Sequence, residues 1–163
     1  MRQSLLPLVI VLLVVSALQI FGMSRLSLFG VSPDMVTVML SLMSVYIGQR
    51  TGMAFGFAAG LIAGLFSGNL GVNLLFRTIE GFTAGYFHVP EESHATKSQK
   101  SRMLYLAIVM ASFAGNLVFN LIENPLGQEL LVRIFANGAL ACVLNLLLGV
   151  IVNRLYLRKT LSE

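Results

Sequence analysis

Residues 48–68 read GQRTGMAFGFAAGLIAGLFSG and carry a glycine at every fourth position. The members of this row are Gly48, Gly52, Gly56, Gly60, Gly64 and Gly68. Residues this small let two helices approach until their backbones touch, which is how many helices associate in lipid. Because an α-helix turns by ~100° per residue, each step of four overshoots one turn by ~40° and the row winds around the helix. We therefore predict a closely packed central helix that meets different neighbours at its two ends; a substrate path along the glycines is the alternative.

The composition around this row is that of a membrane protein. Of the 163 residues, 56% are hydrophobic and 11% are charged, whereas a soluble domain has about 25% charged residues. A soluble domain and a disordered chain are both disfavoured. Cys142 is the only cysteine, so an internal disulfide is impossible and a zinc site is not expected. The net charge of +4 is interpreted as a topology signal and not as a sign of nucleic-acid binding.

The hydrophobic segments predict an all-α integral membrane protein with six transmembrane helices in one domain. Ser32, Pro33 and Asp34 mark one helix start: a capping hydroxyl, a proline at the first helical position and a carboxylate in the first turn. A cleaved signal peptide is the competing interpretation of the first span, because residues 15–17 are small enough for cleavage. The predicted spans are 5–23, 33–48, 52–67, 72–88, 103–122 and 134–152, with a loop at 89–102 and a basic tail at 153–163.

The lysines and arginines divide unequally between the two sides of this six-span arrangement. One side has only Arg25 and Arg133. Because cytoplasmic loops carry the excess of basic residues, we expect both termini, the loop and the tail in the cytoplasm. The residues on that side are Arg2, Arg50, Lys97, Lys100, Arg102, Arg154, Arg158 and Lys159.

A few polar residues lie within the predicted spans. Arg77 and Glu80 are three positions apart on one helix face, and Asn73 precedes Arg77 by four. An ion pair between Arg77 and Glu80 is the simplest way to offset the cost of charge in lipid. Stripes of asparagine on the last two spans are expected to face the same interior, where they serve internal contacts, a partner or a ligand. The candidate contact residues are Asn73, Arg77, Glu80, Asn116, Asn120 and Asn137.

Catalytic patterns are not visible. His88 and His94 fall in or beside the predicted loop, and no zinc-protease, nucleotide-binding or nucleophile-elbow motif occurs. Ser67 lies in a glycine setting, but no histidine is expected at its depth to accept its proton. We predict a protein that is not an enzyme and has no cofactor and no metal.

The chain from Pro33 to Phe87 resembles the bacterial rod shape-determining MreD family. The residues that carry the resemblance are the Pro33-Asp34 helix start, GMAFGFAAGLIAGL at 52–65, Leu70-Gly71, and Gly81-Phe82-x-x-Gly85-Tyr86. The close part covers about a third of the chain, and hydropathy and length extend it loosely. Members of that family often carry an aspartate where this chain has Gly64, so no role is assigned through that acidic residue.

The resemblance implies a non-enzymatic scaffold subunit of the cell-wall elongation machinery in the bacterial cytoplasmic membrane. Its expected partners are an MreC-like bitopic membrane protein, an MreB-like filament, peptidoglycan synthase components and membrane lipids, with no nucleic acid. The family is similar in fold to the substrate-binding subunits of energy-coupling-factor transporters. The alternative function is therefore that of a vitamin-type binding subunit, which needs a closed pocket lined by residues such as Asn116, Asn120 and Asn137.

Overall fold

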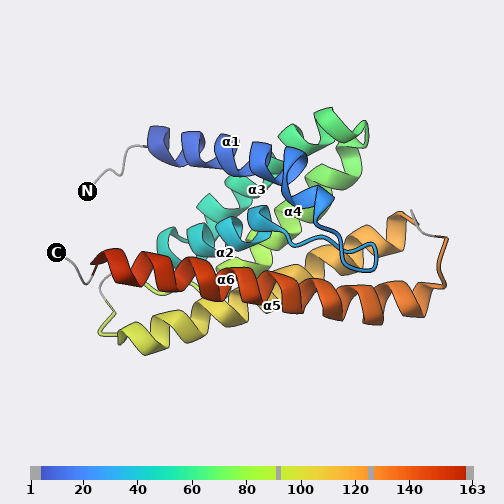
Figure 1. Cartoon of the computed structure of the whole chain (residues 1–163). Helices are drawn as coiled ribbons and strands as arrows, with labels where there is room; N and C mark the ends of the chain where they lie inside the picture. Colours follow the sequence, from blue (N-terminus) through green and yellow to red (C-terminus); the bar gives the residue numbers. More distant parts are fainter. Residues whose placement is uncertain (1–4, 91–92, 125–126, 161–163) are drawn as a thin grey trace.

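The residues that the structure describes form a bundle of six α-helices (Figure 1). A computed structural model describes residues 5–90, 93–124 and 127–160. These ranges contain no β-strand, only an isolated bridge between Leu28 and Val31. The predicted all-α class is thus confirmed. The helices are α1 (Leu5–Phe21), α2 (Met35–Ile47), α3 (Gln49–Ser67), α4 (Leu70–Gly85), α5 (Lys97–Ile122) and α6 (Gly138–Thr160), with short helices η1 (Met23–Arg25) and η2 (Val132–Asn137).

Four helical stretches are long and apolar enough to cross a bilayer: Pro7–Arg25, Gln49–Ser67, Lys97–Ile122 and Val132–Leu155. This is the pattern of a multi-pass membrane protein. Helix α2 is apolar but has only 13 residues. Helix α4 has 16 and contains Arg77 and Glu80. Length and hydropathy thus support four of the six predicted spans, and α2 and α4 remain predicted ones.

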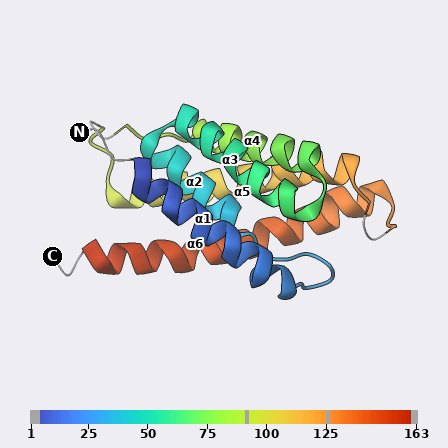
Figure 2. The same ribbon diagram turned by 90° about the horizontal axis from the view of Figure 1, so that it is seen from above.

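Successive helices run in alternating directions along the bundle (Figures 1 and 2). The start of α1, the end of α6 and the α4–α5 connection lie at one end. The α1–α2, α3–α4 and α5–α6 connections lie at the opposite end. Neighbouring helices in the chain are therefore antiparallel.

The short helix α2 is the centre of the bundle. It packs against all five other α-helices, and most of its side chains are buried. Small polar residues such as Thr37, Ser41 and Ser44 are among them. By contrast, α3 leaves Phe57 and Leu65 exposed on its outer side. The prediction of a central α3 was therefore wrong. Helix α3 makes the close glycine contact, but α2 is the helix that the others surround.

The glycine row joins α3 to a single main neighbour, α4. A Cβ at Gly60 would lie 2.6 Å from Asn73 O and 2.7 Å from Leu74 Cα, closer than real side chains come. Only Gly52 also approaches α2, at Ser44. The expected second neighbour is thus confirmed at the Gly52 end, while α4 follows the row from Gly52 to Gly64. Rows of spacing four are inclined to the helix axis, so a neighbour that crosses at a matching angle stays on them. The glycines that meet α4 are Gly52, Gly56, Gly60 and Gly64.

The two remaining glycines of the row form turns. Gly48 has φ +124° between α2 and α3, and Gly68 has φ +74° after α3. The N–H of Gly68 donates to Gly64 O at 3.0 Å. Side chains rarely adopt these angles, so glycine is favoured at both positions.

Five helix starts differ from the predicted ones, and α6 extends to Thr160 into the predicted tail. The starts of α2 and α5 differ for a clear physical reason. Asp34 is itself the N-cap of α2, because its carboxylate accepts hydrogen bonds from the N–H groups of Val36 and Thr37. The helix therefore begins at Met35, after the predicted Ser32 cap. Helix α5 begins at Lys97 instead of 103, because Thr96 and the Gln99 side chain form a capping box. The end of the predicted loop 89–102 is thus helical.

Candidate functional site: a polar cavity between the helices

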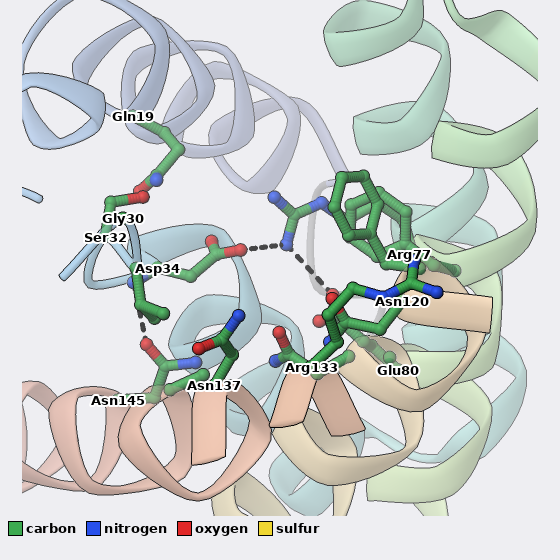
Figure 3. Close-up of a pocket in the computed structure, with 16 residues that line it drawn as sticks. Gln19, Gly30, Ser32, Asp34, Arg77, Glu80, Asn120, Arg133, Asn137 and Asn145 are labelled. Atoms are coloured by element: carbon green, nitrogen blue, oxygen red, sulfur yellow. Dashed lines mark hydrogen bonds and ion pairs between the residues drawn. The ribbon is translucent and has the colours of Figure 1, made fainter. Parts of the chain in front are cut away.

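A cavity of about 320 Å³ opens between the helices near the end of the bundle away from the chain termini (Figure 3). Its volume is at the small end of the range for small-molecule sites. Helices α1, α4, α5, η2 and α6 contribute to it, together with the α1–α2 connection up to Asp34, the N-cap of α2. Its main polar lining residues are Gln19, Ser32, Asp34, Arg77, Glu80, Asn116, Asn120, Arg133, Asn137 and Asn145.

Arg77 lies between two carboxylates from different helices (Figure 3). Its Nη1 is 2.6 Å from Asp34 Oδ2 and 2.9 Å from Glu80 Oε2. Thr37 Oγ1 donates to Glu80 Oε1 at 2.8 Å and accepts from Arg77 Nη1 at 3.1 Å. The predicted ion pair between Arg77 and Glu80 is thus confirmed. With all three groups ionised, Asp34, Arg77 and Glu80 form a cluster with one net negative charge.

Neighbouring residues hold the cluster in place. The guanidinium of Arg77 lies over the ring of Phe76, 4.6 Å from its centroid, which is a stabilising cation–π geometry. Gly115 of α5 makes room for Glu80, since a Cβ there would lie 2.5 Å from Glu80 Cγ. Glu80 is 2% exposed and Arg77 is 6% exposed. Removing either partner would leave a buried charge without full compensation.

Asn145 and Gln19 fix the start of α2 at the cavity wall. Asn145 Oδ1 accepts from the N–H of Asp34 at 2.7 Å, and its Nδ2 donates to Ser112 Oγ at 2.9 Å. Gln19 donates to Pro33 O and accepts from Met35 N. Both amides use donor and acceptor within the protein. Their role is to position Asp34.

Asn120 differs from Asn145 and Gln19 in its hydrogen bonding. Its side chain lines the cavity and is 6% exposed, yet it makes no hydrogen bond to any part of the chain that the structure describes. Asn116, one turn earlier, uses only its Nδ2, which donates to Ser112 O at 2.8 Å. Buried polar groups are normally hydrogen-bonded. The amide of Asn120 is therefore available to a molecule inside the cavity.

Another part of the lining comes from η2, a short π-helix that contributes Arg133 and Asn137. Arg133 Nη1 donates to Glu123 O at 2.6 Å, and its buried Nε has no partner. Within the described ranges Arg133 forms no ion pair. Asn137 Nδ2 donates to Gln128 Oε1 at 2.8 Å. Short π-helical turns are rare and occur frequently at functional sites.

The structure brings most of the predicted polar candidates together. Arg77, Glu80, Asn116, Asn120 and Asn137 all line the cavity. Asn73 does not, because its Nδ2 donates to Ser67 Oγ and Asn69 O at the α3–α4 turn. The six glycines of the row serve packing and turns away from the cavity.

Sequence reasoning gave no site role to several lining residues. Asp34 was interpreted only as a helix-start carboxylate, and its pairing with Arg77 has no spacing signal because it joins separate helices. Arg133 was counted only for topology. Its position as an isolated charge beside an apolar stretch was the sequence signal that could have marked it as a site residue.

The site is suited to hydrogen bonding. No three His, Cys, Asp or Glu side chains gather as a metal site among the residues that the structure describes. His88 contacts Val45 O at 2.9 Å, away from the cavity lining. The cavity instead offers the carboxylates of Asp34 and Glu80, the guanidinium of Arg133 and the carboxamides of Asn116, Asn120 and Asn137.

Comparison with known proteins does not identify the chain: no family model, no curated protein and no solved structure matches it.

Proposed function

We propose that this protein is a non-enzymatic membrane scaffold subunit of the bacterial cell-wall elongation machinery, of the MreD class. It acts in the cytoplasmic membrane, with both termini in the cytoplasm, by binding an MreC-like single-span protein. An MreB-like filament and peptidoglycan synthase components are further proposed partners. The basic residues near the start of α5, Lys97, Lys100 and Arg102, would face the filament or anionic lipid headgroups.

One observation carries this proposal: the residues that resemble the MreD family form one packed unit of α2, α3 and α4. Asp34 of the helix start pairs with Arg77 of α4. The glycine row of α3 packs on α4, where Gly81 in turn meets Gly52. The resemblance therefore covers residues that depend on one another in three dimensions, and this supports a shared fold unit over a chance run of glycines.

An apolar groove on the outside of the bundle offers a place for the single-span partner. It lies between α1 and α3 and has almost no polar surface. Ala54 and Ala58 form a pair of small residues four positions apart on its α3 side, a spacing that favours close helix contact in lipid. Its other lining residues are Val9, Leu12, Leu13, Phe55, Leu61 and Ile62.

Photocrosslinking in native membranes tests this function. A photoreactive amino acid at Ala54 should capture a single-span membrane protein encoded with cell-shape genes. The matched control is Leu147, which is exposed on α6, and it should not capture that protein. Capture at neither position, together with a partner-free protein after mild purification from its own host, would contradict the scaffold function.

A second candidate function is that of a small-molecule-binding membrane subunit of a transporter. The observation that favours it is the cavity, which contains Asn116, Asn120 and Asn137. A solute that remains bound through purification and is identified by mass spectrometry would support this function. Uptake of that solute should then require a coupling subunit, and binding without any uptake would contradict a transport role.

A further inference from the structure

We propose that the cavity is a binding site for a small zwitterion, a molecule that carries an ammonium group and an anionic carboxylate or phosphate group. This inference deepens the second proposed function by naming the ligand class. It requires binding only and not transport. The scaffold function does not depend on it.

The charges of the walls argue for a zwitterion over a simple ion. With both carboxylates ionised, the Asp34, Arg77 and Glu80 cluster has two negative charges for one guanidinium and is net negative. Arg133 supplies a positive charge that no carboxylate of the described residues pairs with. A lone anion would pair only with Arg133, and a lone cation only with the carboxylates. A molecule with one charge of each sign complements both groups.

The neutral part of the lining supplies the hydrogen bonds. Asn120 is more than nine-tenths buried, lines the cavity and has both its donor and its acceptor unused among the described residues. The Oδ1 of Asn116 is a further acceptor without a described partner. These unpaired amide atoms reach the open space of the cavity. A ligand inside it can therefore accept from and donate to them directly.

The polar surroundings are rigid enough to select a ligand. Asn145 and Gln19 hold the backbone at Asp34, and Thr37 together with Phe76 holds Arg77. A site whose groups are already positioned loses less entropy when a ligand binds.

This chemistry has two sources in a membrane: a free zwitterionic solute and the headgroup of phosphatidylethanolamine. Both present an ammonium group near an anionic oxygen. The experiment must therefore vary soluble ligands and lipids separately.

The test uses the full chain in nanodiscs of phosphatidylglycerol alone. Glycerophosphoethanolamine and β-alanine are added as free zwitterions, with ethanolamine and glycerol 3-phosphate as single-charge controls. The melting temperature is recorded across each titration, because a ligand that binds the folded state raises it. A second set of nanodiscs contains phosphatidylethanolamine without added ligand.

A zwitterion should raise the melting temperature where its single-charge fragments do not. Stabilisation by a free zwitterion assigns a solute site, and stabilisation by phosphatidylethanolamine alone assigns a lipid site. The Asn120→Leu and Arg133→Lys variants should weaken binding by about tenfold or more. Asn73→Leu is the matched control, because Asn73 lies outside the cavity lining, and its affinity should equal that of the wild type.

Three results would overturn the inference. The first is that a single-charge fragment stabilises as strongly as the zwitterion. The second is that neither zwitterion source has any effect. The third is that Asn120→Leu, folded as judged by its melting in the absence of ligand, binds as the wild type does. Crosslinking at Ala54 is independent of all three results, so the scaffold function is judged separately.

Discussion

Replacing Arg77 with methionine should destabilise the protein strongly. Methionine keeps much of the side-chain length but removes the charge that lies 2.6 Å from Asp34 and 2.9 Å from Glu80. Because the Glu80 side chain is only 2% exposed, its carboxylate would be left without a nearby cation. Breaking a buried ion pair in this way typically costs about 3–5 kcal/mol. The lost cation–π contact with Phe76 adds roughly 0.5–1 kcal/mol.

A double-mutant cycle separates the ion pair from general packing effects. The free energy of unfolding is measured in mixed detergent micelles for wild type, Arg77→Met, Glu80→Gln and the double variant. Glu80→Gln removes the carboxylate that Arg77→Met leaves unpaired. The double variant should therefore be more stable than the sum of the two single effects predicts, by about 1–3 kcal/mol. Strict additivity, or a cost below about 1 kcal/mol for Arg77→Met, would refute the description of Arg77 and Glu80 as a buried ion pair that stabilises the fold.

Three further predictions concern packing and helix ends. Gly60→Val should destabilise the α3–α4 contact by about 1–3 kcal/mol, because its Cβ would lie 2.6 Å from Asn73 O; unfolding measurements that show no loss would contradict the close approach. Gly71→Ala in α4 is the matched control, because a Cβ there meets nothing within 4 Å, and it should be neutral or raise stability by about 0.4–1 kcal/mol. Thr96→Ala removes the cap of α5 and should cost about 1 kcal/mol, seen as faster hydrogen exchange in the first turn of α5; unchanged exchange there would contradict the capping box.

The general architecture was accessible from the sequence because hydrophobic length and glycine spacing are local signals. They identified the long helices and the close contact made by α3. The place of α2 at the centre was not accessible. Its small polar residues, such as Thr37 and Ser44, are buried against other helices, and only the packing of the whole bundle shows that protein and not lipid surrounds them.

The site was partly accessible for the same reason. Asn116 and Asn120 share a helix face, so their spacing alone predicted that they face one interior. Asp34 and Arg77 are joined across two helices, and no periodicity reports a contact of that kind. Arg133 reaches the cavity from a π-helical turn, a geometry that the 3.6-residue period does not describe.

The most direct measurement of the central claim, a polar cavity inside a membrane bundle, is cysteine labelling in membranes. Cys142 is first replaced with alanine, and Asn116→Cys at the cavity is compared with Ala111→Cys, which lies on the same helix and is fully buried. A small water-soluble thiol reagent added outside intact cells should modify Asn116→Cys and leave Ala111→Cys unmodified. Equal protection of both cysteines would contradict a water-accessible cavity, and labelling only from the cytoplasmic side would contradict the proposed orientation.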